Sequence, residues 1–128
     1  MARTKSAKAW REAIRKNCKD VGTYRPAFEP VISTLASILV NRDKAIQLFE
    51  LSGGKVVVSH TNRNGATNLE QNPALRLAND LNRDALSYWR DLGLTPAGLK
   101  KINEEALKGK KRSAFEEALL SISADGDE

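Results

Sequence analysis

The sequence has very little cysteine and histidine, the side chains that carry much of enzyme and metal chemistry. Among 128 residues it has one cysteine, Cys18, and one histidine, His60. A single cysteine cannot form an internal disulfide, so a reducing, cytosolic location is expected. A metal site needs several ligands and a nucleophilic triad needs an oriented histidine, but His60 has no cysteine or paired carboxylates nearby. We therefore expect no catalytic residue, no metal, no cofactor and no enzyme activity, with Cys18 as a buried structural thiol.

Aromatic residues and long apolar runs are also scarce. Aromatics make up 5% of the chain against 41% hydrophobic residues in all, which predicts an aliphatic, helix-rich core rather than a β-sandwich. The apolar run 31–40 is interrupted by Ser33, Thr34 and Ser37, and it is far shorter than the roughly 20 residues of a membrane span. The basic N-terminus is not followed by the apolar segment of a secretory signal. We expect one compact domain plus tails, and no membrane association.

Charge is abundant and unevenly distributed along the chain, with a net charge of +5. The first 25 residues hold eight cations against two acids, and residues 99–112 hold six cations against two acids. Residues 113–128 hold five acids and no cation. Two basic segments, a balanced middle and an acidic end indicate a scaffold with two kinds of partner. The alternative is that the charges only keep the protein soluble.

Residues 72–102 contain a complete helix, its stop signal and the start of another helix. Asn72 precedes Pro73, and proline suits the first helical position because no backbone N–H is needed there. Gly93 suits the left-handed conformation that ends a helix, and Thr95 with Pro96 begins the next one. Between these signals an apolar seam recurs at spacings of three and four residues. Its members are Ala74, Ala78, Leu81, Ala85, Tyr88 and Leu92.

Two further helices are expected upstream. Residues 6–19 have an apolar side and a basic side, and Gly22 with the prolines at 26 and 30 delays the next helix to Glu29 or Pro30. That helix continues to Leu51, with 41–43 as a candidate bend or interruption. Its apolar face is wide, which indicates burial against a second subunit as well as its own core; the alternative is a fully intramolecular bundle. We expect the contact between copies to include Leu35, Leu39, Ile46, Phe49, Leu81 and Tyr88.

Between the two long helices the sequence predicts a small β-hairpin or an extended loop. Gly53-Gly54 ends the helix, Val56–Val58 are β-branched residues that favour a strand, and Asn64-Gly65 is a strong turn signal. Residues 66–70 would return as the second strand. Because an isolated hairpin is marginally stable in water, we expect it to lean on a helix or on a neighbouring subunit.

The chain after Gly109 predicts a linker, Lys110–Arg112, followed by a short amphipathic helix and a disordered polar end from Ser123. This helix is a candidate for docking into a partner's groove, and packing back on its own domain is an equal alternative. The side chains proposed to bind a partner are Phe115, Leu119, Leu120 and Ile122.

The predicted fold class is mainly α. We expect an antiparallel helical hairpin core, flanking short helices, and the β-hairpin or loop between the long helices. The chain divides into a basic N-terminal helix (1–22), a helical oligomerisation core with a β insertion near 55–70 (23–109), and a C-terminal amphipathic helix with an acidic tail (110–128).

The two basic segments are the candidate DNA-binding surface. Lysine and arginine neutralise phosphates and release counterions, which gives sequence-independent affinity that falls steeply with salt. The aromatic residues lie among apolar neighbours and suit a core better than a base-stacking platform, which favours double-stranded DNA. The candidate contacts are Arg3, Lys5, Lys8, Arg11, Arg15, Lys16 and Lys19 in the first segment, and Lys100, Lys101, Lys108, Lys110, Lys111 and Arg112 in the second.

The ordered set of helix-end signals resembles the phage terminase small subunit family of the P27 type. The resemblance rests on Asn72-Pro73, a helix containing Tyr88-Trp89, and the closing Leu92–Pro96, with Gly53-Gly54, a short β segment and Asn64-Gly65 upstream. It covers roughly residues 10–103. The chain departs from the family pattern at Ala97-Gly98-Leu99, where a more polar, arginine-containing helix start is expected, and it has little room for a separate DNA-binding domain ahead of the core.

The resemblance implies a non-catalytic component of the viral genome-packaging motor, acting in the host cytoplasm. Such subunits bind double-stranded viral DNA, form ring-shaped homo-oligomers, and recruit or regulate the large terminase subunit, which carries the ATPase and nuclease. Two alternatives stay open. One is a dimeric helix-turn-helix DNA-binding regulator that places Pro96–Lys108 in the major groove. The other is a structural adaptor of phage particles with no role at DNA.

Overall fold

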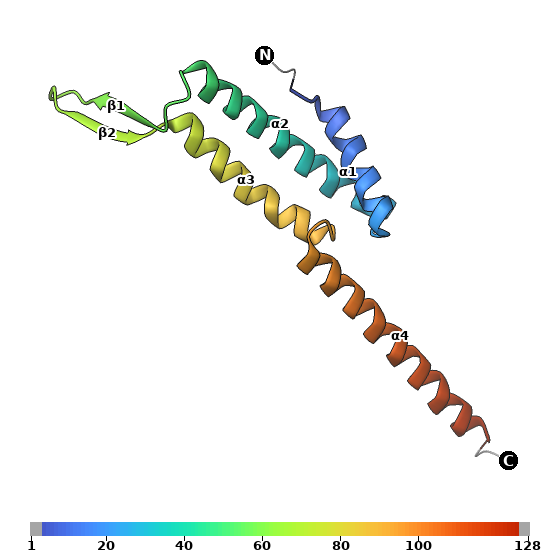
Figure 1. Ribbon diagram of the computed structural model, residues 1–128. Coiled ribbons are helices and arrows are strands. Elements are labelled where there is room, and N and C mark those ends of the chain that lie inside the picture. The colour runs from blue at the N-terminus through green and yellow to red at the C-terminus, as the bar shows by residue number, and fades with distance from the viewer. Residues whose placement is uncertain (1–3, 126–128) are drawn as a thin grey trace.

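The computed structural model describes residues 4–125 and is mainly helical, with a small two-stranded antiparallel sheet between the long helices (Figure 1). This confirms the predicted fold class. Helices α2 and α3 lie side by side and antiparallel, and α1 packs on α2. The elements in chain order are α1 (Ala7–Val21), the 3-10 turn η1 (Pro26–Phe28), α2 (Glu29–Leu51), β1 (Val57–Thr61), β2 (Thr67–Gln71), α3 (Pro73–Asp91) and α4 (Pro96–Asp125).

The helix boundaries agree with the local signals in the sequence. The Ser6 hydroxyl accepts a hydrogen bond from the Ala9 N–H (3.1 Å) and caps α1, and Asn72 caps α3 in the same way through the Ala74 N–H (3.0 Å). The chain passes through η1 before α2 begins at Glu29, as the prolines predict. Helix α2 then runs without interruption through residues 41–43 to Leu51.

The hydrophobic core lies where α1 and α3 pack against the first half of α2. Burying aliphatic side chains of this size stabilises the fold by about 1.5–3 kcal/mol each, relative to leaving them in water. The prediction that Leu35 and Leu39 contact a second copy is wrong, because neither side chain has any exposed surface in the protomer. The periodicity identified the right helix face but could not say that α1 and α3 would cover it. The buried cluster consists of Ile14, Cys18, Ile32, Leu35, Ala36, Leu39, Ala85 and Leu92.

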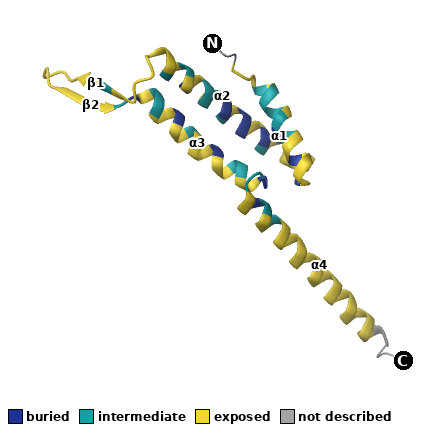
Figure 2. Ribbon diagram, viewed as in Figure 1, coloured by how far each residue is buried: buried dark blue, intermediate teal, exposed yellow. Residues whose placement is uncertain are grey.

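The β-hairpin forms in the predicted place and projects beyond the end of the α2–α3 pair (Figures 1 and 2). Its pairing runs from Val57 opposite Gln71 to Thr61 opposite Thr67. Each strand has one partly buried residue and is otherwise exposed, so the hairpin does not lean on a helix of its own chain. It is held at its root, where the buried Asn72 side chain donates to the Lys55 carbonyl (2.9 Å) and the Ser52 hydroxyl (3.0 Å).

Helix α4 differs most from the prediction. It is one continuous helix of 30 residues, without the linker expected after Gly109 and without the disorder expected from Ser123; residues 126–128 lie outside the described part. An isolated glycine costs only about 1 kcal/mol in a helix, and the neighbouring Ala, Leu, Lys and Glu residues favour helix strongly enough to offset it. Every side chain described from 103 to 123 is exposed, so this arm stands clear of the core (Figure 2).

None of the described helices combines the length and the apolar character needed to cross a membrane.

Candidate nucleic-acid interface

The basic residues of α1 are partly engaged within the protomer. The Arg15 guanidinium hydrogen-bonds both carboxylate oxygens of Glu29 (2.8 and 3.1 Å), and the Tyr24 hydroxyl donates to the same carboxylate (2.7 Å). These bonds, that of Arg15 first, hold the pKa of Glu29 below its ordinary value, while Glu29 raises the pKa of Arg15. Arg15 therefore ties α1 to the start of α2 and is less available to phosphate than its position in the sequence indicates.

Two more cations of the N-terminal basic segment lie over aromatic rings. The Lys5 ammonium lies 4.6 Å from the Trp10 ring centre, and the Lys19 ammonium lies 4.9 Å from that of Tyr24. Exposed cation–π contacts stabilise by about 0.5–1 kcal/mol, so they orient these ammonium groups without removing them from solvent. Lys16 pairs with the exposed Asp20 at 3.8 Å, which is a weak interaction.

Among the N-terminal candidates that the structure describes, Lys8 and Arg11 form neither an ion pair nor a cation–π contact. Lys8 is exposed and Arg11 is half-buried. Arg3 lies outside the described residues.

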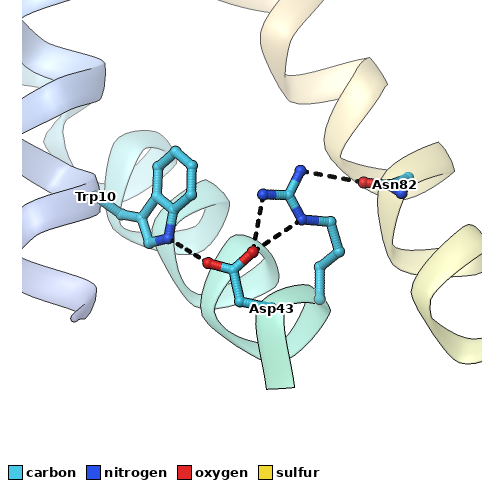
Figure 3. A network of polar contacts seen from close by, with 4 residues as sticks. Trp10, Asp43 and Asn82 are labelled. Carbon is cyan, nitrogen blue, oxygen red and sulfur yellow. Dashed lines mark hydrogen bonds and ion pairs between the residues drawn. The ribbon is translucent and has the colours of Figure 1, made fainter. Parts of the chain in front are cut away.

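A polar network that sequence reasoning missed fixes the position of α1 on the bundle (Figure 3). The Trp10 indole N–H donates to Asp43 Oδ2 (3.0 Å), and the Arg42 guanidinium donates to Asp43 Oδ1 (2.9 and 3.2 Å) and to Asn82 Oδ1 (3.2 Å). The network joins α1, α2 and α3 and sets which side of α1 faces outward. No local signal could have revealed it, because Trp10 and Asp43 are 33 positions apart.

The cations of α4 are exposed and largely unpaired. Lys100 approaches Glu104 at 4.0 Å, which is a weak exposed pair, whereas the other α4 candidates form no ion pair within the described chain. Helical spacing places Lys101, Lys108 and Arg112 in one row along the helix, spanning roughly 16 Å. Lys110 and Lys111 point to other sides of α4. We name Lys101, Lys108 and Arg112 the basic row.

The structure does not bring the two basic segments together into one surface. Helix α1 packs on α2, whereas α4 contacts chiefly the end of α3 and then projects away from the bundle (Figure 1). A single protomer thus presents two separate positive surfaces. Of these, the basic row is the less engaged by neighbouring acids.

The other residues that the sequence predicted to contact a second copy or a partner differ in how exposed they are. Ile46 lies at the border of exposure, and Phe49, Leu81 and Tyr88 are half-buried, with Tyr88 packed against the core. The apolar residues near the end of α4 are well exposed: Phe115 by 64%, Leu119 by 49%, Leu120 by 71% and Ile122 by 69%. The exposed leucines Leu48, Leu51, Leu77 and Leu86 on α2 and α3 were not among the predicted contacts.

Cys18 and His60, the two residues considered for catalysis, lie in different surroundings. Burial raises the pKa of the Cys18 thiol, and its side chain has no exposed surface. His60 is exposed on β1, 4.0 Å from Glu70 on the neighbouring strand. Within the described residues no three histidine, cysteine or acidic side chains lie close enough together to hold a metal ion.

Comparison with known proteins gives one finding. Residues 7–108 match the model of the family described as phage terminase, small subunit. No match was found among curated proteins or among solved structures. Because the family match spans most of the chain, from α1 into the middle of α4, the protein belongs to the phage terminase small subunit family.

Proposed function

We propose that this protein is a non-catalytic small terminase subunit that binds double-stranded viral DNA, assembles into a ring and recruits the large terminase subunit. Membership of the family supports a role in phage DNA packaging, in the cytoplasm of the infected host. The observation that carries the proposal is the exposed arm of α4. It presents a row of unpaired cations followed by large apolar side chains, and the protomer covers neither.

The basic row supports DNA binding as the first of these roles. Lys101, Lys108 and Arg112 have no acidic partner in the described chain, so contact with phosphate breaks no ion pair of the protomer. Backbone binding of this kind is independent of sequence and strongly dependent on salt. In a ring the row is repeated once per protomer, and the repeats act together on one duplex because each contact raises the effective concentration of the next. The α1 cations add a second positive surface.

Exposed apolar surface supports the other two roles. Clusters of large exposed apolar side chains are characteristic of surfaces that bind another protein. The half-buried and exposed apolar residues of α2 and α3 suit contacts between copies, with Ile46, Phe49, Leu81 and Tyr88 as candidates. The end of α4 suits recruitment of the large subunit, with Phe115, Leu119, Leu120 and Ile122 as candidates.

The DNA-binding role is tested by measuring affinity for a short duplex as a function of salt, using fluorescence anisotropy. Four to six phosphate contacts give a slope of about −4 to −5 in log K against log salt, at about −0.9 per contact. Changing Lys101, Lys108 and Arg112 to alanine should reduce the slope by about 2.7. The matched control changes Arg63, Arg76 and Arg83, three exposed arginines outside both basic segments, to alanine.

The control should retain most of the wild-type slope. An equal reduction of the salt slope in both triple variants would mean that only net charge matters, and it would remove the basic row from the proposal. A loss confined to a variant with Lys8, Arg11, Lys16 and Lys19 changed to alanine would place the DNA on α1 instead. Absence of any salt-dependent binding would favour an adaptor without a DNA role.

Native mass spectrometry tests the assembly. A closed oligomer larger than a dimer supports the packaging role, whereas a dimer favours the alternative of a helix-turn-helix regulator.

A further inference from the structure

An apolar seam near the end of α4 is left without a partner in its own chain. Phe115, Ala118, Leu119 and Ile122 recur at helical spacings of three and four residues, so they share one face of the helix. Their neighbour Leu120 lies on the opposite side and is equally exposed. A seam of this pattern is what a helix presents when it is laid into a groove.

The corner between α3 and α4 prevents the seam from folding back on its own bundle. Gly93 takes a left-handed conformation (φ 73°), and the Thr23 hydroxyl donates to the Leu92 carbonyl at 2.7 Å. Gly98 packs so closely on the Arg90 carbonyl that even a Cβ would overlap it. Because α4 is continuous from this corner, Phe115 lies roughly 28 Å along the helix axis from Pro96.

A groove with apolar walls, like the apolar seam, lies at that same corner between α3 and α4. It has a volume of about 790 Å³ and runs between the end of α1, the end of α3 and the start of α4. Its apolar walls include Val21, Trp89 and Leu99. A second hollow of about 530 Å³ shares Pro96 and Leu99 with it and continues along α4 to Leu107. Two apolar hollows that share Pro96 and Leu99 therefore adjoin each other along the start of α4.

The charges around the two surfaces are complementary. Asp20 lies on the groove, exposed and only weakly paired with Lys16. On α4, Lys111 lies on the same side as the seam, one turn before Phe115, whereas Glu117 points away from the seam by helical geometry. A docked seam therefore brings the Lys111 cation to a groove whose lining carries one charged side chain, that of Asp20.

We infer that the seam of one protomer docks into the corner groove of a second copy of this chain. The seam and the groove are different surfaces, so the contact is head-to-tail, and such a contact closes into a ring when the rotation between copies allows it. The inference rests on the proposed ring assembly and names its interface. It also divides the end of α4 between two partners. Phe115, Leu119 and Ile122 face the next copy, and Leu120 with Glu116 stays outside for the large subunit.

Cross-linking tests the inference directly. Val21→Cys places a thiol in the groove and Leu119→Cys places one on the seam; both positions are exposed, so neither change disturbs the core. The fully buried Cys18 can remain, because it is shielded from the reagent. A short bismaleimide should join the double variant into ladders of three or more chains, while each single variant gives at most dimers. The control double variant, Val21→Cys with Leu120→Cys, should give no ladder.

Oligomer mass supplies a second measurement. Leu119→Glu should shift the native mass to monomers, and Leu120→Glu should leave it unchanged. If wild type is oligomeric and Leu119→Glu does not alter its mass, the seam–groove contact is wrong and the ring stands. If Leu119→Glu keeps the mass but loses pull-down of the purified large subunit, the seam belongs to that partner. A monomeric wild type at micromolar concentration overturns both this inference and the proposed ring.

Discussion

Replacing Gly98 with alanine tests whether the α3–α4 corner sets the direction of the arm. A Cβ at this position overlaps the Arg90 carbonyl oxygen and comes within 2.9 Å of the Thr95 hydroxyl. That hydroxyl also accepts the hydrogen bond from the Gly98 N–H that caps α4 (3.0 Å). The added methyl group therefore pushes against backbone on one side and against the helix cap on the other.

The expected change in the free energy of unfolding of Gly98→Ala follows from two opposing effects. Overpacking costs about 1–3 kcal/mol, and the upper end applies here because a backbone carbonyl yields less readily than a flexible side chain. Alanine recovers up to about 1 kcal/mol through its higher helix propensity. We expect Gly98→Ala to lower the free energy of unfolding by about 2 kcal/mol, which corresponds to roughly 8 °C in Tm for a domain of this size.

The matched control is Gly109→Ala, the same substitution in the same helix. No atom lies within 4 Å of a Cβ at Gly109, so only helix propensity applies, and the variant should be equal to wild type or more stable by up to about 1 kcal/mol. The assay is urea denaturation followed by circular dichroism at matched protein concentration, because assembly stabilises the folded state by mass action. Equal unfolding midpoints for the two variants would refute the close packing at the corner.

Three further predictions concern the bundle. Asp43→Ala leaves the Trp10 indole N–H and the Arg42 guanidinium without their shared acceptor. It should lower the free energy of unfolding, measured in urea, by about 2 kcal/mol. An unchanged free energy would mean that this network does not stabilise the packing of α1 on the bundle. The folded-state pKa of Glu29 lies below its unfolded value, so the stability that ionised Glu29 contributes to the fold is complete above about pH 4.5 and is lost as pH falls through the folded pKa. Glu29→Gln should therefore flatten the acid limb of a curve of unfolding free energy against pH. An unchanged acid limb would contradict this. Cys18 should resist a thiol reagent at pH 8 in the folded protein and react only at the rate of unfolding, whereas prompt labelling would mean that α1 detaches readily.

The candidate site was only partly readable from the sequence. Charge composition located both basic segments, because it requires no knowledge of packing. It could not show that Arg15 is held by Glu29, since this partner depends on how α1 sits against α2. Three of the four seam residues of α4 were among the predicted partner contacts, but Leu120 was not separated from them. The groove at the corner was not predicted, because it is assembled from three helices.

The sequence by itself determined the features that neighbouring residues encode. These are the caps at Ser6, Asn72 and Thr95, the turn at Asn64-Gly65, and the late start of α2 after its prolines. Each depends on hydrogen bonds or backbone preferences within a few positions, so local chemistry is sufficient to specify it.

Only the tertiary structure decided which apolar surface is core and which is free. Leu35 and Leu39 became core because they lie in one buried cluster with residues of α1 and α3, and the end of α4 stayed exposed because the corner at Gly93 and Gly98 directs it away from the bundle. The physical reason is that burial depends on contacts between segments far apart in the chain. Periodicity places a residue on a helix face, but only packing determines what covers that face.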